Sequence, residues 1–268
     1  MKSLYESILD MDEKKSDWEA LNNIVEKETG WTLSSDGKYI LSGTKHFPGN
    51  IDTHFYGNKD NEWFEKLISC AKKYKLKIQP LGLLTLRSDS IHLLEGVDIE
   101  YICKLHICAN DPVDIDLSKI KSPIRRISFT KVGNSYCDVN SITLPKTSVI
   151  TACSGLYTGW EGLQNIKNMN CTNLIVSENK DKIFLINPKA GDVNLIKMQQ
   201  FVDNNPNVTN FYIETRENGK KKYYQMKLKG RNVVGVLGKS VGALISKGVL
   251  EDYNQKNADY REWYEKHM

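Results

Sequence analysis

Leu81-Gly-Leu-Leu-Thr-Leu-Arg-Ser-Asp89 is a stretch with leucines at its first, fourth and sixth positions. Apolar residues return at this spacing along the chain, and the first positions of successive copies lie 21, 22, 23, 24 and then 37 residues apart. The later copies are Ile102/Leu105/Ile107, Ile124/Ile127/Phe129, Thr147/Ile150/Ala152, Cys171/Leu174/Val176 and Val208/Phe211/Ile213.

The spacing predicts one short strand per copy. Alternate side chains of a strand point to opposite faces, and a single short strand cannot bury its apolar face alone. We therefore expect the strands to stack into a roughly parallel sheet over positions 81–216, with an irregular α+β domain as the alternative. The side chains expected to point into the core are those of residues 84, 86, 105, 107, 127, 129, 150, 174, 176, 211 and 213.

Three copies carry Asp or Asn eight residues after their first position, at Asp89, Asn110 and Asn179. The resulting pattern, L-x-x-L-x-L-x-x-N/D, resembles the leucine-rich repeat in a divergent form with uneven repeat lengths. The resemblance implies a curved solenoid that binds proteins, without a catalytic residue to carry over. The fourth copy fits least well, with Thr147 and Ala152 at core positions and Gly155 in place of Asn.

The flanking segments are expected to cap this solenoid, giving an α/β protein. We divide the chain into a leader helix (1–17), an α+β cap (18–80), the repeats (81–216) and a C-terminal hairpin with a helical cap (217–268). In the first cap we expect a helix from 18 to 30, a hairpin around Asp36-Gly37 and a helix from 61 to 74. In the last we expect a pair of helices over 233–250 and an exposed amphipathic helix over 253–267.

Composition indicates an ordinary globular protein. Of 268 residues, 40% are hydrophobic and 26% charged, which suffices for a sizeable core. No signal peptide or long apolar segment is evident, so we expect a cytoplasmic protein without a membrane role. The six cysteines form no C-x-x-C pair, which favours reduced thiols.

Other motifs fall short of a catalytic or metal site. Gly235-Val-Leu-Gly-Lys-Ser240 lacks the earlier glycine of a phosphate-binding loop, and His46 and His54 have no third ligand at a recognised spacing. Ser154 lacks the flanking glycines of a nucleophile elbow. We therefore expect no enzyme and no cofactor. The basic segment from Lys220 to Arg231 is interpreted as a solvated hairpin, because a net charge of +4 does not argue for nucleic acid.

The side chains that alternate with the core positions should form a concave binding face. In the first half this face would carry a basic cluster of Arg87, Lys104, His106 and Arg126, because neighbouring strands lie about 4.8 Å apart. In the second half it would be apolar, with Ile175 and Tyr212. A basic cluster beside an apolar surface is suited to a protein partner with an acidic group.

The first residues, Lys2-Ser-Leu-Tyr-Glu-Ser-Ile-Leu-Asp10, are similar to a short leader on proteins of gut Bacteroidales and their crAss-like phages. Two functions follow from these observations. The first is a non-enzymatic protein-binding scaffold that uses the concave face. The alternative is a phage-encoded virion or anti-host accessory protein with an N-terminal docking tag. The oligomeric state stays open.

Overall fold

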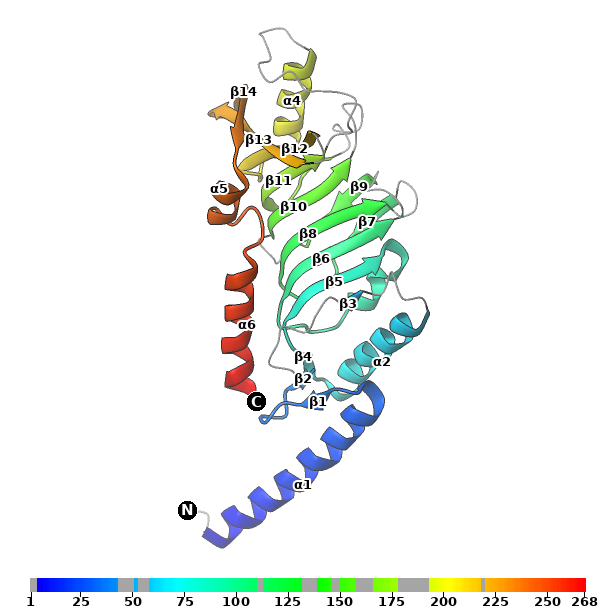
Figure 1. Ribbon diagram of the computed structural model, residues 1–268. Helices are drawn as coiled ribbons and strands as arrows, with labels where there is room; N and C mark the ends of the chain where they lie inside the picture. The colour runs from blue at the N-terminus through cyan, green and yellow to red at the C-terminus, as the bar shows by residue number, and fades with distance from the viewer. Residues whose placement is uncertain are drawn as a thin grey trace.

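The computed structural model describes residues 4–42, 51–52, 58–109, 113–131, 139–145, 150–157, 166–177, 193–217 and 220–268. It has the mixed α/β class that the sequence predicts, built on one large sheet (Figure 1). Nine strands form this sheet in the order β14-β13-β12-β11-β10-β8-β6-β5-β3. Their bounds are β3 Ile51–Asp52, β5 Leu81–Arg87, β6 Ile102–Ala109, β8 Ile124–Lys131, β10 Ile150–Tyr157, β11 Cys171–Ser177, β12 Asn210–Glu217, β13 Lys220–Lys229 and β14 Asn232–Lys239.

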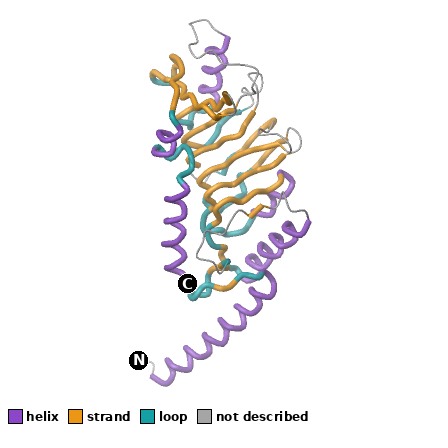
Figure 2. Tube along the Cα trace, viewed as in Figure 1, coloured by secondary structure: helices purple, strands orange, loops and turns teal. Residues whose placement is uncertain are grey.

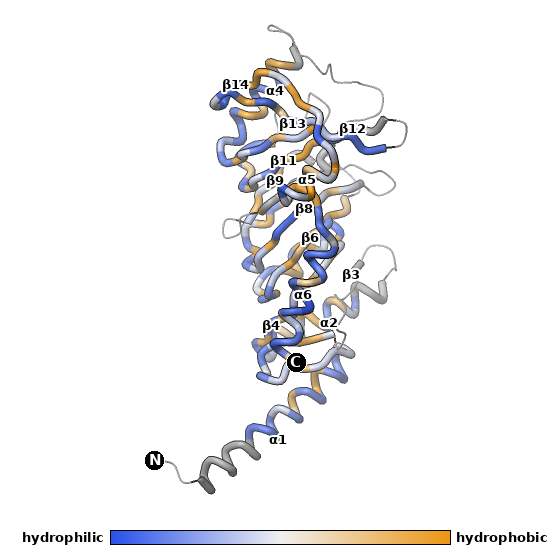
Figure 3. The backbone as a smooth tube through the Cα atoms, turned by 60° about the vertical axis from the view of Figure 1, so that its left-hand side comes forward, coloured by the Kyte–Doolittle hydropathy of each residue, from blue (hydrophilic) through white to orange (hydrophobic). Residues whose placement is uncertain are grey.

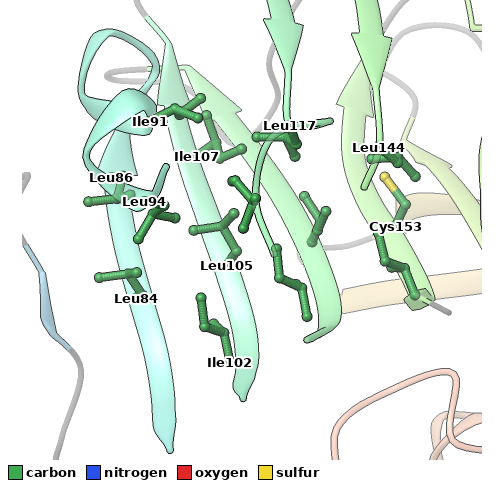
Figure 4. Packing of buried hydrophobic residues seen from close by; sticks show 14 of the residues in the cluster. Leu84, Leu86, Ile91, Leu94, Ile102, Leu105, Ile107, Leu117, Leu144 and Cys153 are labelled. Atoms are coloured by element: carbon green, nitrogen blue, oxygen red, sulfur yellow. The ribbon is translucent and has the colours of Figure 1, made fainter. Parts of the chain in front are cut away.

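The strands from β3 to β12 run parallel, which confirms the predicted sheet. In the first three copies the register is also as expected, with Leu84 beside Leu105 and Leu105 beside Ile127. These three side chains are 0–1% exposed and belong to the main core. Figure 4 shows Leu84 and Leu105 in this core. Equal spacing in the sequence thus places equivalent residues side by side, so that each apolar row is covered by the next.

The register predicted for the fourth copy is wrong. Residue 150 was expected to align with residue 127, whereas Cys153 pairs with Ile127. The expected core position Ala152 therefore lies on the opposite face, and Cys153, expected on the concave face, is fully buried in the core. The pairing of β10 with β11 shifts between Cys153 and Leu156, which indicates a β-bulge that the periodic spacing could not show.

The core face of the large sheet is covered by returning segments of the chain (Figure 2). After β6 and β8 these segments form two strands, β7 (Val113–Asp116) and β9 (Val139–Thr143), which pair parallel to each other. Leu117 and Leu144 carry this layer into the core (Figure 4). Helix α4 (Val193–Asn204) and the 3-10 helix η1 (Ser88–Leu94) contribute further buried residues. Asp89 lies within η1 and is exposed, whereas Asn110 and Asn179 lie outside the described residues.

The N-terminal part contains one long helix where two were expected. Helix α1 runs without a break from Leu4 to Thr29 and crosses the predicted boundary at residue 17. Its second half packs on the body, where Trp18 Nε1 donates to the Ser34 carbonyl and Val25 is fully buried. Its first half reaches away from the sheet (Figure 1). The predicted hairpin and second helix are present, as β1 (Thr32–Leu33), β2 (Tyr39–Leu41) with β4 (Lys77–Ile78), and α2 (Asn58–Tyr74).

The C-terminal part differs most from expectation. The segment predicted as a helix pair is instead β14, which pairs antiparallel with β13, followed by the short helix α5 (Val241–Ser246). Helix α6 (Tyr253–His267) has the predicted bounds but is not simply exposed. It runs back along the sheet to the N-terminal cap (Figure 1). There Tyr260 and Tyr264 are 0–1% exposed, and the ring of Trp263 contacts that of Tyr39 edge-on with 5.1 Å between ring centroids.

Candidate binding face

The face of the large sheet opposite the main core is called the inner face below. Its residues alternate with the core residues along each strand, and Lys104 pairs with Arg126 between β6 and β8. Helices α5 and α6 lie on this side of the sheet (Figure 3). The side chains predicted for the concave face therefore share one face of the sheet, but part of this face is occupied by the chain itself.

The apolar end of the inner face is covered by the segment 241–252, called the C-terminal strap. Ile175 and Tyr212, predicted to be exposed for a partner, are each 1% exposed because they pack against Leu244 and Val249 of the strap. The prediction that these two side chains are exposed to a partner is therefore wrong. Burial of apolar side chains of this size contributes about 1.5–3 kcal/mol each, which explains why the strap settles there.

Arg126 holds the strap through polar contacts. Its Nη2 donates to the Leu250 carbonyl at 3.1 Å and lies 3.4 Å from the Gly248 carbonyl, while Nη1 is 3.9 Å from Glu251 Oε1. The carboxylate of Glu251 also pairs with Lys256 at 3.2 Å. The acidic group expected from a partner is therefore supplied, at this arginine, by the chain's own strap.

Lys104 lies beside Arg126 and was expected to face solvent. It is half-buried, and desolvation lowers the pKa of its ammonium group. Among the described residues it forms no hydrogen bond and no ion pair within 4.0 Å, although the charge of Glu251 raises its pKa in part. Together with Arg126 it lines a cavity of about 340 Å³ between the inner face and the strap.

The other predicted site residues lie on the part of the inner face away from the strap. Arg87 is exposed at the end of β5 and pairs with Asp89 at 3.6 Å. His106 is half-buried, and its Nδ1 lies 2.6 Å from Ser128 Oγ on the neighbouring strand. The structure thus places all four basic residues on three successive rows of the same face, as predicted, but with different surroundings.

A serine and histidine in contact are one element of a hydrolase site, but the surroundings of Ser128 differ from such a site. Ser128 stands in the middle of β8, between His106 of β6 and Ser154 of β10. The backbone N–H groups of a central strand are used in the sheet ladder, so they are not free to stabilise an oxyanion. We interpret the contact as a cross-strand hydrogen bond.

Other candidate chemistry receives little support from the described part of the chain. No group of three or more His, Cys, Asp or Glu side chains there could hold a metal ion. His46, His54 and Cys137 lie outside the described residues. The other five cysteines are buried free thiols, and burial raises the pKa of Cys153 well above its usual value. No described helix combines the length and the apolar character needed to span a bilayer.

The basic hairpin has a structural component that the sequence did not reveal. Arg231 donates to the carbonyls of Val208, Val202 and Asn205, near the C-terminal end of α4. A cation at this position satisfies carbonyl groups that a helix end leaves unpaired. Lys220, Lys222 and Lys227 of β13, in contrast, are exposed, as expected of a solvated hairpin.

The strap residues Leu244, Val249 and Glu251 were missed as parts of the site. The sequence signal was present, since Leu244-Ile-Ser-Lys-Gly-Val-Leu-Glu251 joins apolar residues to an acidic one. It could not be assigned to the inner face, because the contacts join residues more than 120 positions apart. Comparison with known proteins adds no relative: no family model, curated protein or solved structure matches the chain.

Proposed function

We propose that the protein is a non-enzymatic scaffold, built on a short leucine-rich-repeat-like solenoid, that binds a protein partner on its inner face. The parallel strands β5, β6, β8, β10, β11 and β12 follow one another in chain order across the sheet, which supports a solenoid-like stack. We place its action in the cytoplasm. The observation that most directly supports this proposal is that the inner face already binds a segment of its own chain.

The strap shows what kind of segment this face suits. Its apolar residues pack on Ile175 and Tyr212, and its acidic residue lies at Arg126. Apolar contacts give such an interface its stability, and the cation fixes register and favours an acidic partner. The part of the inner face around Arg87 and His106 continues this surface beyond the strap and supplies further positive charge. We therefore propose an acidic segment of a partner protein as the ligand.

A charge-reversal experiment tests this function. The double variant Arg87→Glu with His106→Glu should lose the partner captured from extract of the native host, because it places two negative charges on the proposed surface. The control variant Lys66→Glu with Lys121→Glu changes two exposed lysines elsewhere and should capture the partner at the wild-type level. Capture by the wild type should also decrease as the salt concentration rises, because the Debye length falls to about 10 Å at 0.1 M ionic strength. Equal capture by both variants would place the interface elsewhere.

The alternative of a docking tag is favoured by a separate observation. Helix α1 is anchored by its second half, and its first half projects from the body (Figure 1). A helix that projects from a folded body can be bound by another protein without disturbing the domain. Transfer of residues 1–29 to an unrelated fluorescent protein should then bring that protein to the phage particle or host complex, whereas the same fusion with Leu4 and Ile8 changed to Asp should stay unbound. Binding of both fusions, or of neither, would remove the tag hypothesis.

A further inference from the structure

The cavity between the inner face and the C-terminal strap has an unusual combination of walls. Its apolar lining includes Ala152, Ile175, Val249 and Leu250, and its charged lining consists of Lys104, Arg126 and Glu251. Its volume of about 340 Å³ lies within the range of roughly 300–1,000 Å³ typical of small-molecule sites. An apolar body with one charged end would match these walls.

The positive charge at this cavity exceeds the negative charge that the described residues place there. Lys104 and Arg126 are adjacent across the strands, and Lys256 approaches through its pair with Glu251. Among the described lining residues, the two cations Lys104 and Arg126 face one carboxylate, that of Glu251, which also pairs with Lys256. The next lysine, Lys221, is paired with Glu214 at 2.9 Å and leaves this balance unchanged.

Two polar groups at the cavity lack partners within the described structure. The Arg126 Nε atom is buried without a hydrogen-bond acceptor, and the Lys104 ammonium group has neither a hydrogen bond nor an ion pair. Buried polar groups in proteins are nearly always satisfied, so an unsatisfied donor beside a cavity indicates a place for an acceptor. Between two cations that acceptor would be an anion.

We propose that this cavity binds a small organic anion with an apolar body, such as a carboxylic acid or a phosphate monoester. The anionic head lies at the Lys104 ammonium group, beside the Arg126 guanidinium group, and the apolar body lies against Ile175 and Val249. This site is distinct from the proposed protein interface and requires no protein partner. Because the strap forms its outer wall, the bound ligand also joins the strap to the sheet.

Isothermal titration calorimetry with three matched probes tests the proposal. The probes are octanoate, octyl phosphate and 1-octanol, which share the apolar body and differ in the head. At least one of the two anions should bind the wild-type protein saturably at one site and at least about tenfold more tightly than the alcohol, because a charge-assisted hydrogen bond is stronger than a neutral one. Whichever anion binds more tightly identifies the head that the site prefers.

Variants locate the binding. Lys104→Met removes the charge while keeping a similar shape and should weaken the anion about tenfold without changing the alcohol. Lys121→Met, at an exposed lysine, should bind like the wild type. Ala152→Leu should block all three probes by filling the cavity, which provides a second test if Lys104→Met does not fold. Equal affinity for anion and alcohol, unchanged anion binding by Lys104→Met or Ala152→Leu, or no saturable binding of either anion to the wild type would overturn the proposal.

Discussion

Removal of the Arg126 guanidinium group should release the C-terminal strap while leaving the sheet folded. In Arg126→Met, the strap loses the 3.1 Å hydrogen bond to the Leu250 carbonyl and the longer contacts to the Gly248 carbonyl and Glu251. Glu251 keeps its pair with Lys256, and the apolar contacts of Val249 remain. The perturbation therefore acts on attachment of the strap and not on the core.

The free energy that Arg126 contributes to attachment of the strap follows from these distances. Only the bond to Leu250 lies within the usual range of about 2.7–3.2 Å, and a hydrogen bond to a charged group contributes about 1.5–3 kcal/mol. Loss of the repulsion between Arg126 and Lys104 offsets part of this. We expect the substitution to lower the free energy of opening of the strap by about 1–2 kcal/mol. This corresponds to an equilibrium constant for opening that is about five- to thirtyfold larger.

Native-state hydrogen exchange measures this opening directly. The amides of Val249 and Leu250 donate to the Leu244 carbonyl at 2.9 and 3.2 Å, so their exchange reports the strap. The matched control is Arg125→Met, which removes a partly exposed ion pair to Asp259 worth less than about 1 kcal/mol. Wild-type exchange of both amides in Arg126→Met, or equal acceleration in Arg125→Met, would refute the assigned role of Arg126.

Three further predictions concern the core, the cap and alkaline pH. In urea denaturation, Cys153→Asp should cost several kcal/mol because it places a charge in the apolar core, whereas Ser154→Asp should cost far less because position 154 is half-buried on the inner face; the reverse order would show that the β10 register is wrong. Tyr260→Ala should cost about 3–5 kcal/mol by leaving a cavity under α6, while Glu262→Ala, at an exposed position of the same helix, should stay within about 0.5 kcal/mol by thermal denaturation. Burial raises the pKa of Tyr260 to about 12, so the folded state holds its proton more tightly than the unfolded state, and stability should fall as pH rises from about 10 to about 12. Titration of tyrosinate absorbance in the native protein checks this, and a Tyr260→Phe variant that titrates identically to the wild type would contradict it.

The sequence determined the periodic part of the fold. Leu84, Leu105 and Ile127 lie side by side as their spacing predicts, because strand alternation and the gain from stacking apolar rows are local and repetitive. The same regularity placed Arg87, Lys104, His106 and Arg126 on one face. Spacing failed at the fourth strand, where Cys153 and not Ile150 pairs with Ile127 and Leu174, and a bulge after Cys153 adds one more residue that no periodic pattern marks.

Only the tertiary structure decided what covers the inner face. The spacing of apolar residues places Ile175 on the inner face. It does not say whether Val249 of the same chain or another protein covers this side chain. Arg126 and Glu251 meet across a separation of 125 positions, and the return of α6 to the N-terminal cap depends on contacts such as that of Trp263 with Tyr39. Contacts of this kind depend on the free energy of the whole folded structure. A long intervening loop does not prevent them, because its closure adds only a small entropic cost. For that reason the sequence predicted which side chains share the inner face but not the strap that covers part of it.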